Sequence, residues 1–438
     1  MARLSVIGAG YLGVTHAVCM AHLGHDVVVI DTNTQRIEQL AAGIVPFHEP
    51  ELAELLTKTI ASGTITFTND WATIAANADV HFLCVGTPQQ SGSHAADMSQ
   101  VFGAVASLSE HLSGSATVVG KSTVPVGTAA TIAAQLKDRC GDDVRLVWNP
   151  EFLREGFAVQ DTLHPDRIVL GVSDESDANI VKEIYAASLS DGTPLLVTDY
   201  ATAELVKVAA NAFLATKISF INAFADLADA TGADITQLAD AIGHDTRIGR
   251  RFLNAGVGFG GGCLPKDIRA LQARATELGL ADQFAFLTAV DDINKSRQRT
   301  VVERTLEALD GNLEHKTVAI LGAAFKPDSD DVRDSPALHV AQTLADNGAR
   351  VQIHDPEAIR VLRSKESDLV LCDSIEEALT DADVVLHLTE WAVYREIDPA
   401  QVGALVRNRV IIDGRNVLDR DRWTNADWSI SYLGKPGS

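Results

Sequence analysis

The stretch Gly8-Ala9-Gly10-Tyr11-Leu12-Gly13 decides the predicted fold, because it joins a short β-branched run to a helical pattern. Its first glycine permits a tight turn, its second lets a pyrophosphate approach the backbone, and its third lets the helix pack closely on the strand. The helix N-terminus adds N–H donors and partial positive charge. Asp31 ends the next strand, where a carboxylate accepts hydrogen bonds from ribose hydroxyls and repels a 2′-phosphate. The pattern therefore predicts a dinucleotide-binding domain that prefers NAD to NADP.

Outward from this stretch, short β-branched runs alternate with helical stretches as far as about residue 200. We expect strands at residues 4–7, 26–31, 79–85, 117–121, 145–149 and 167–172. Buried strands separated by helices are typical of a doubly wound, mainly parallel sheet.

From residue 201 to residue 311 the strand pattern stops, and apolar residues recur at helical spacing. The stripe on the first helix consists of Leu205, Val208, Phe213, Ile218, Ile221, Phe224 and Leu227. Because this stripe is wide, we expect the helix to pack on two sides. The excess apolar surface predicts self-association, with a dimer formed through this helix.

After residue 312 the alternation restarts, with strands expected at residues 317–321, 350–354, 368–372, 383–387 and 409–413. The predicted fold class is α/β, with two Rossmann-like doubly wound domains joined by a long central helix and a helical connector. We place the N-terminal NAD-binding domain at residues 1–200, the central helical dimerisation domain at 201–311 and the second Rossmann-like domain at 312–438.

The composition narrows the classes of partner. Among 438 residues, 36 Lys and Arg stand against 59 Asp and Glu, which gives a net charge of −23. Such a field repels polyanions, so nucleic acid and anionic membrane surfaces are not expected as partners. A small anionic ligand stays possible if a local set of cations binds it.

Five cysteines lie far apart and never form a CxxC pair, which argues against a disulfide scaffold and against a structural metal site. No apolar run approaches the roughly 18 residues of a membrane span. The chain enters its first strand without a signal-peptide pattern. We therefore expect a reducing, cytoplasmic setting.

The second chemical motif is Gly260-Gly261-Gly262-Cys263-Leu264-Pro265-Lys266-Asp267. Three consecutive glycines let the backbone pass very close to a neighbouring group, and a thiol, an ammonium and a carboxylate follow directly. A lysine near a cysteine increases the thiolate fraction, and the thiolate is the nucleophilic form. The alternative is a small buried cysteine after a helix-capping turn. We expect that alternative for Cys19, Cys84, Cys140 and Cys372.

Lys207 and Asn211 lie four residues apart on the long helix, hence on one face, among apolar neighbours. A lysine in such a place either extends to solvent or is buried against an anion.

Glu151 and Glu155 follow the strand at 145–149 and would share one face if this segment were helical. One of them is a candidate general base, and ordinary charge at a helix N-terminus is the alternative. Thr123 follows the strand at 117–121 in the same way. Both segments lie at the carboxyl end of the expected sheet, where doubly wound folds bind ligands.

In the C-terminal part, Lys326, Arg333 and Arg415 each follow an expected strand. Cations clustered at one sheet edge of an acidic protein predict an anion-binding face.

Together these motifs resemble the UDP-glucose/GDP-mannose dehydrogenase family over essentially the whole chain, in the family's order. Pro165-Asp166-Arg167-Ile168 is most similar to the branch that acts on UDP-glucose. The resemblance implies two successive NAD-dependent oxidations of the C6 alcohol of UDP-glucose, which give UDP-glucuronate. It also implies that Cys263 holds the intermediates as a thiohemiacetal and then a thioester.

The resemblance further implies roles for single residues. Glu155 would handle protons around the hydrolytic water, Thr123 and Asp267 would hold that water, and Lys207 with Asn211 would stabilise the oxyanion. NAD would be bound by Gly8, Gly10, Leu12, Gly13, Asp31, Arg36, Thr123, Glu155, Lys266 and Arg333. The C-terminal domain would bind UDP-sugar, and substrate contacts would come from Glu151, Phe152, Leu153, Arg154, Lys207, Asn211, Arg247, Phe252, Leu253, Asn254, Ala255, Gly256, Gly260, Lys326 and Arg415. Arg247 would reach the site of a neighbouring subunit, and Arg36 is equally well explained as a solvated helix arginine.

Two alternatives stay open at this point. The same chemistry on GDP-mannose or UDP-N-acetylmannosamine needs the same motifs. A non-catalytic NAD-binding sensor would explain the glycines, but it has no use for a nucleophile together with a proton-transfer residue.

Overall fold

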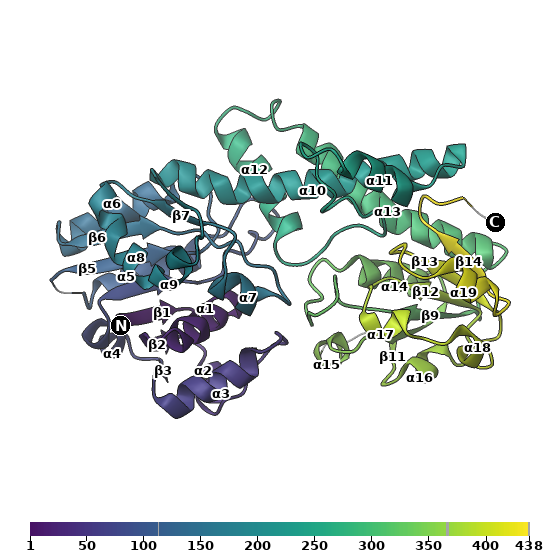
Figure 1. Cartoon of the computed structure of the whole chain (residues 1–438), viewed down its shortest axis with the longest axis horizontal. Coiled ribbons are helices and arrows are strands. Elements are labelled where there is room, and N and C mark those ends of the chain that lie inside the picture. The colour runs from purple at the N-terminus through teal and green to yellow at the C-terminus, as the bar shows by residue number, and fades with distance from the viewer. Residues whose placement is uncertain (113, 365–367, 437–438) are drawn as a thin grey trace. The chain divides into compact units, whose positions relative to one another are not determined.

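The computed structural model describes residues 1–112, 114–364 and 368–436, which fold into two compact units (Figure 1). Unit 1 comprises residues 1–210 and 269–279, and unit 2 comprises residues 211–268 and 280–438. Two helices contribute residues to both units: α10 (Tyr200–Thr231) and α12 (Leu264–Glu277).

Unit 1 is built on an eight-stranded sheet in the order β3-β2-β1-β4-β5-β6-β7-β8. All neighbours are parallel except β6 and β7, which pair antiparallel. The strands are β1 (Arg3–Ile7), β2 (Asp26–Ile30), β3 (Ile65–Thr68), β4 (Val80–Leu83), β5 (Ala116–Gly120), β6 (Val144–Trp148), β7 (Ile168–Gly171) and β8 (Leu195–Thr198). The order of the first six is that of a dinucleotide-binding fold, as the glycine-rich turn predicts.

Helices cover both faces of this sheet, because successive strand residues point to opposite sides. Val27 and Val29 face one apolar core, while Val28 and Ile30 face the other. Helix α1 packs against α3 and α7 on the first side, and α5 packs against α6 on the second. The helices of unit 1 are α1 (Tyr11–His22), α2 (Thr34–Ala41), α3 (Leu52–Ser62), α4 (Trp71–Asn77), α5 (Ser99–Ser109), α6 (Thr128–Cys140), α7 (Ala158–Leu163), the 3₁₀ turn η1 (Glu175–Asp177), α8 (Ala178–Ile184) and α9 (Ala186–Ser190).

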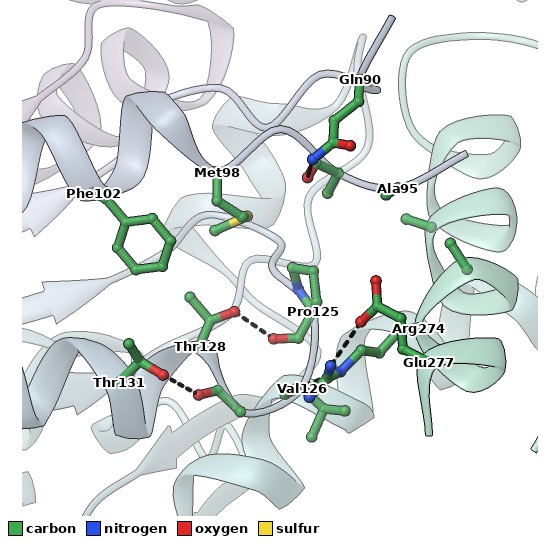
Figure 2. A pocket seen from close by; sticks show the side chains of 14 residues that line it. Gln90, Ala95, Met98, Phe102, Pro125, Val126, Thr128, Thr131, Arg274 and Glu277 are labelled. Atoms are coloured by element: carbon green, nitrogen blue, oxygen red, sulfur yellow. Dashed lines mark hydrogen bonds and ion pairs between the residues drawn. The ribbon is translucent and has the colours of Figure 1, made fainter. Parts of the chain in front are cut away.

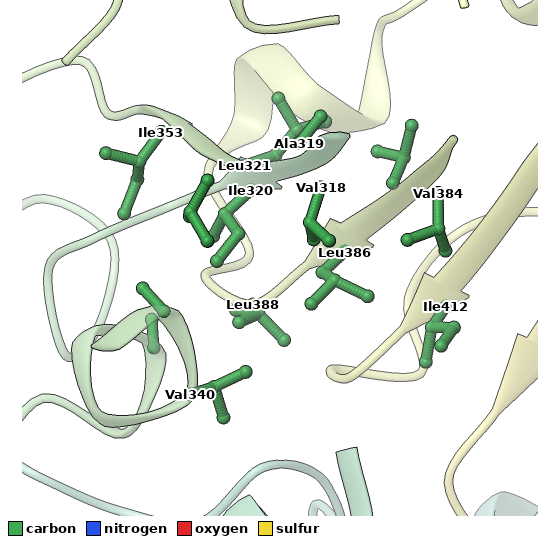
Figure 3. Packing of buried hydrophobic residues seen from close by; sticks show 14 of the residues in the cluster. Val318, Ala319, Ile320, Leu321, Val340, Ile353, Val384, Leu386, Leu388 and Ile412 are labelled. Carbon is green, nitrogen blue, oxygen red and sulfur yellow. The ribbon is translucent and has the colours of Figure 1, made fainter. Parts of the chain in front are cut away.

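Unit 2 contains a six-stranded, fully parallel sheet in the order β11-β10-β9-β12-β13-β14. Its strands are β9 (Thr317–Leu321), β10 (Arg350–His354), β11 (Val370–Leu371), β12 (Val384–His387), β13 (Val410–Asp413) and β14 (Ser429–Tyr432). The central strands β9 and β12 are wholly buried, and their Ile320 and Leu386 side chains lie in one continuous core (Figure 3). This order repeats that of the first six strands of unit 1.

The other helices of unit 2 are α11 (Ile235–Gly243), α13 (Phe286–Ala308), α14 (Pro336–Asp346), α15 (Ala358–Leu362), α16 (Ile375–Leu379), α17 (Ala392–Arg395), α18 (Pro399–Val402) and α19 (Arg420–Thr424). Two Rossmann-like sheets and a long central helix confirm the predicted fold class. The boundaries of the three expected domains stay a prediction.

Helix α10 is long and apolar enough to cross a membrane by length and composition, with a mean hydropathy of 1.3 over its most apolar window. The expectation of no span differs because α10 intersperses its apolar residues with polar ones such as Lys207, Asn211 and Lys217. Less than half of that window, 44%, is buried inside the protein. Several of its polar side chains are nevertheless bound inside the fold, including Glu204, Lys207 and Asn222.

Candidate active site

The glycine-rich turn of unit 1 has the geometry that a pyrophosphate site needs. Gly8 has a φ of +100°, which favours glycine, and a Cβ on Gly13 would lie 1.8 Å from the Gly8 carbonyl oxygen. A Cβ on Gly10 would meet nothing within 4 Å, and no described side chain caps the N-terminus of α1 there. The backbone donors at this helix end therefore face space that a phosphate can enter.

Asp31 lies at the end of β2, beside this turn. Its Oδ2 accepts a hydrogen bond from the Ala9 N–H at 2.7 Å, and its Oδ1 accepts from the Asn33 N–H at 2.8 Å. Arg36 at the start of α2 lies 3.6 Å from the same carboxylate. The carboxylate is thus oriented by the backbone, and each oxygen retains a lone pair for a ribose hydroxyl.

The segment at residues 149–157 is a loop, so the expectation that Glu151 and Glu155 share a helical face is wrong. Helix α7 begins only at Ala158, and the Glu151 carboxylate turns back to accept from the Leu153 N–H at 2.8 Å. The loop persists because Glu151 makes a tertiary contact instead. Its Oε1 lies 2.8 Å from the Lys207 ammonium on α10.

Lys207 is therefore buried against an anion rather than extended to solvent. Lys207 is 5% exposed, and its ammonium lies 5.7 Å from the centre of the Phe152 ring. The Arg167 guanidinium lies 3.8 Å from the centre of the same ring. Removing either partner of such a buried ion pair would leave the other group buried without its counter-charge. Arg154 in the same loop is exposed, and its guanidinium pairs with Asp161 at 2.6 Å.

Thr123 lies in the β5–α6 loop, which two hydrogen bonds tie to the loop that follows β4. The Thr87 hydroxyl donates to the Thr123 carbonyl at 2.8 Å, and the Ser122 hydroxyl donates to the Val85 carbonyl at 2.7 Å. The far end of the loop is held by Glu204 on α10, whose carboxylate accepts from the Gly127 and Ala129 N–H groups at 2.7 and 2.6 Å.

A cavity of about 260 Å³ adjoins this loop in unit 1 (Figure 2). Met98 and Phe102 line one part of it, and Arg274 lines another while donating to the Val126 carbonyl at 3.1 Å. None of the predicted site residues is among those that line it.

In unit 2, Cys263 is the exposed one among the five cysteines. It stands directly before α12, and its carbonyl accepts from the Asp267 N–H at 2.9 Å, so the thiol is at the positive end of a helix. Burial raises the pKa of Cys19 and Cys84 to about 12 and that of Cys372 to about 11. Those three thiols are unreactive by comparison.

The three glycines before Cys263 pack against residues 325–334. A Cβ on Gly260 would lie 2.2 Å from the Asp334 carbonyl oxygen, and one on Gly262 would lie 2.3 Å from the Arg333 guanidinium carbon. Gly261 has a φ of +83° and donates its N–H to the Arg333 carbonyl at 2.9 Å. Here the close neighbour that the glycines permit is the chain's own loop.

Asp267 organises the polar groups one turn beyond the thiol. Its side chain is 2% exposed, with Oδ2 accepting from the Asn211 amide at 2.7 Å and Oδ1 lying 2.6 Å from the Lys266 ammonium. The sequence motif therefore forms a connected network of a carboxylate, an ammonium and an amide next to Cys263.

The loop that carries Phe252, Leu253, Asn254, Ala255 and Gly256 is fixed from several sides in unit 2. Leu253 and Ala255 are buried, and Phe252 has a φ of 65°, a strained value for a bulky residue. The Gly256 N–H donates to Asn222 at 2.8 Å, and its carbonyl accepts from Arg297 at 3.2 Å. A rigid loop of this kind can present backbone groups to a ligand.

Three predicted cations of unit 2 each contact a side chain that is close to them in sequence. Arg333 pairs with Asp331 at 2.7 Å, and the largely exposed Arg247 pairs with Asp245 at 2.6 Å. Lys326 lies with its ammonium 5.2 Å from the centre of the Phe325 ring. The anion-binding face stays a prediction.

Arg415 has an unexpected set of partners. Its guanidinium donates to the Leu388, Gly258 and Phe325 carbonyls at 2.7, 3.1 and 3.1 Å. It therefore ties three loops of unit 2 together, and contact with a ligand stays a prediction.

Several residues that organise the site carry no sequence signal. Asn294 on α13 clamps Phe259 by accepting from its N–H at 2.8 Å and donating to its carbonyl at 2.9 Å. Glu49, Glu204, Asn222 and Arg297 act similarly on other loops. Each is a single polar residue in an ordinary helix or loop context, so only its partner in space marks it. In the described part of the chain, no group of three or more His, Cys, Asp or Glu could hold a metal ion.

Family models match the chain in three consecutive parts. The NAD binding domain of the UDP-glucose/GDP-mannose dehydrogenase family matches residues 2–189, its central domain matches 201–296, and its UDP binding domain matches 319–420.

Relatives match over nearly the whole chain. A UDP-glucose 6-dehydrogenase of Rhizobium meliloti is 39% identical, covering 99% of this chain and 100% of the relative. A UDP-glucose 6-dehydrogenase of Bacillus subtilis is 38% identical, covering 100% and 94%. Among solved structures, a UDP-glucose dehydrogenase from Pyrobaculum islandicum is 38% identical with a TM-score of 0.90, covering 100% of this chain and 98% of that one. A UDP-D-ManNAc dehydrogenase from Pyrococcus horikoshii is 26% identical with a TM-score of 0.86, covering 99% of each chain.

Proposed function

This chain belongs to the UDP-glucose/GDP-mannose dehydrogenase family, and we propose on that premise that it oxidises UDP-glucose to UDP-glucuronate with two NAD as hydride acceptors. The observation that carries the proposal is the exposed Cys263 thiol at the start of α12, beside the bonded Asp267, Asn211 and Lys266 groups. A non-catalytic sensor finds no support among relatives named as dehydrogenases.

The residues of unit 1 fit NAD. The uncapped start of α1, with open space at Gly10, offers backbone N–H donors for the pyrophosphate. The oriented Asp31 carboxylate offers acceptors for the ribose hydroxyls. Bound NAD supplies the hydride acceptor for both oxidation steps. The protein's task is to bind the sugar and to hold C6 near the thiol.

Covalent capture at Cys263 explains how one site completes two oxidations. In the proposed sequence the first oxidation leaves an aldehyde at C6, and the thiolate adds to its carbonyl carbon, so that a C–S bond forms and the oxygen gains a proton. Loss of that proton and of a hydride to a second NAD gives a thioester. The aldehyde never leaves, because it stays bonded to sulfur throughout.

Hydrolysis then releases the product. The oxygen of a water molecule attacks the thioester carbon, the C–S bond breaks, and Cys263 departs as the thiolate. The C6 carboxylate forms as the two protons of the water leave, one to a base and one to solvent. We assign Glu155 to accept a proton of that water, Thr123 and Asp267 to hold it, and Lys207 and Asn211 to stabilise the negative oxygen of the intermediate. Lys207 and Asp267 already have the burial that strengthens such contacts.

The test is the stoichiometry of purified protein with a panel of nucleotide sugars. UDP-glucose is expected to yield two NADH per UDP-glucuronate, with GDP-mannose and UDP-N-acetylmannosamine as the competing substrates. Cys263→Ser should form a slowly hydrolysed ester, and Cys263→Ala should lose the second oxidation. Cys140→Ser, at a half-buried thiol of unit 1, serves as the control. Four-electron turnover by Cys263→Ala would refute covalent capture, and preference for another sugar would refute the substrate.

We also propose that the chain is a cytoplasmic homodimer, joined through α10. Phe213, Phe220 and Leu227 are 65%, 47% and 56% exposed and recur every seven residues, so they form one apolar stripe on the helix. In such a dimer, Arg247 would extend from one subunit toward the substrate of the other.

A further inference from the structure

Glu49 is a buried carboxylate in the loop before α3, and its residue is 6% exposed. Its Oε1 accepts from the Ala158 N–H at 2.7 Å, and its Oε2 accepts from the Gly156 N–H at 2.7 Å. The Tyr11 hydroxyl donates to the same Oε2 and accepts from the Gly156 N–H at 3.1 Å. Glu49 and Tyr11 therefore meet at one backbone N–H of the loop that follows β6.

That N–H belongs to the peptide bond between Glu155 and Gly156, so holding it fixes the backbone of Glu155. Gly156 has a φ of +78°, which sets the chain's direction into α7. Phe157 caps the helix with no side-chain hydrogen bond, and the Glu49 carboxylate takes that place. Both hydrogen-bond acceptors for the peptide come from outside the loop.

Tyr11 connects this arrangement to the glycine-rich turn, since it is the first residue of α1. Its ring packs on Phe47 at 4.9 Å between centroids, two residues before Glu49. Burial, followed by the bond to Glu49, raises the pKa of the Tyr11 phenol far above its ordinary value, so the hydroxyl stays a donor at neutral pH. Three segments of unit 1 thus meet at one carboxylate.

We infer that Tyr11 and Glu49 are positioning residues that hold Glu155 in place for the hydrolysis step. The inference rests on the proposed function, in which Glu155 takes a proton from the water that cleaves the thioester. It predicts that loosening the pair slows hydrolysis more than it slows oxidation.

The experiment uses Tyr11→Phe and Glu49→Gln in the full-length chain. Tyr200→Phe is the matched control, because it too removes a hydroxyl that donates a hydrogen bond within unit 1, in this case to the Leu146 carbonyl at 2.9 Å. We expect steady-state kcat to fall roughly tenfold or more in the two site variants, because small displacements of a reacting group are costly. The first burst of NADH should persist, and intact-mass measurement during turnover should show the substrate bonded to Cys263. Tyr200→Phe should match the wild type.

Hydrogen exchange of residues 152–159 gives a readout that does not depend on turnover. Faster exchange there in both site variants is expected, with the rest of the chain unchanged. A wild-type kcat in Tyr11→Phe would overturn the inference. So would an NADH burst that falls as much as kcat with no substrate bonded to Cys263. Unchanged hydrogen exchange of residues 152–159 in the two site variants would also overturn it. If Glu49→Gln fails to fold, Tyr11→Phe decides alone. A wild-type protein that makes no NADH from any sugar refutes the proposed function, and the exchange data still decide whether the pair holds the loop.

Discussion

Cys263 owes its special position to its exposure and to its place at a helix N-terminus. The thiols of Cys19 and Cys84 have a pKa of about 12 because they are buried. At pH 8 this shift leaves them with a thiolate fraction roughly 10³-fold below that of an ordinary thiol. We expect iodoacetamide to alkylate Cys263 fast in the native protein, as followed by peptide mass spectrometry. Cys263→Ser should abolish the fast phase, and fast labelling of Cys84 would contradict the assignment.

Asp413 at the end of β13 is a second residue whose environment makes a prediction. It is fully buried, accepts from the Val417 and Leu418 N–H groups at 2.8 and 2.7 Å, and lies 2.8 Å from His387. Burial raises the pKa of Asp413, but His387 and the backbone donors outweigh it, so the pKa lies below its ordinary 3.8. A lowered folded-state pKa means that stability is present above the unfolded value and is lost as the pH falls through the folded value.

Asp413→Asn should therefore lower the free energy of unfolding by about 3 kcal/mol at pH 7. The difference from the wild type should narrow as the pH falls below about 4, where the Asp413 carboxylate begins to protonate in the unfolded wild-type chain while it is still ionised in the folded one. Urea unfolding followed by tryptophan fluorescence at pH 7, 5 and 3.5 measures this. Asp373→Asn is the control, because that exposed acid pairs with Arg363 on the surface. A difference that stays constant with pH would count against the assignment.

At the scale of elements, Glu204 joins the starts of two helices. Gly127 caps α6 with a φ of 98° and no side-chain bond of its own, so the carboxylate from α10 satisfies the donors. Burial raises the pKa of Glu204, which means that its charge costs folding free energy at neutral pH. Removal of the acceptor leaves buried N–H groups unsatisfied.

Glu204→Ala should accordingly lower the free energy of unfolding by about 2 kcal/mol. Glu204→Gln keeps one acceptor oxygen and removes the buried charge, so it should lose less. Thermal unfolding and hydrogen exchange of residues 123–131 measure the two effects. The exposed Glu54 of α3 provides the comparison through Glu54→Ala. Equal stability of Glu204→Ala and the wild type would refute the capping role.

The central strands were predictable from the sequence, and the edge strands were not. Strands β1, β2, β9 and β10 are buried, so their β-branched runs stand out from the flanking polar residues. The strands β3, β8 and β14 escape notice because they lie at sheet edges and are half exposed, with short mixed sequences such as residues 65–68. At β11, also an edge, only two of the five expected residues form a strand.

The candidate site divides in the same way. The glycines of the turn at residues 8–13 and those directly before Cys263 follow patterns that local backbone geometry requires, so the sequence reveals them. Glu49 and Asn294 act on chain segments far away in sequence, and their effect depends on a fold that no local pattern encodes. The loop at residues 151–157 was predicted wrongly for the same reason, because Glu151 pairs with Lys207 on α10 instead of sharing a helical face with Glu155.

At the scale of the whole molecule, acidic residues outnumber basic ones and the net charge is −23. Even cations of the predicted site are paired with acidic side chains of the protein. Arg247, Lys266 and Arg333 each lie within 2.7 Å of an aspartate oxygen. A dinucleotide or nucleotide sugar must therefore be recognised by groups at short range, such as helix ends and oriented donors. Attraction from a distance contributes little, because the long-range field is negative.

Self-association is the prediction that belongs to the whole molecule. Phe213, Phe220 and Leu227 form a contiguous exposed apolar stripe, and such a patch marks an interaction surface. Large apolar side chains at the centre of an interface supply most of its binding free energy. The double variant Phe213→Asp/Phe220→Asp should weaken association at least about 10²-fold and give monomers at micromolar concentration. Sedimentation velocity measures the mass, and Val393→Asp, at an exposed valine of α17, should stay dimeric. Because these side chains are half exposed or more in a single chain, the double variant should still fold. A monomeric wild type, or a dimeric double variant, would show that α10 is not the interface.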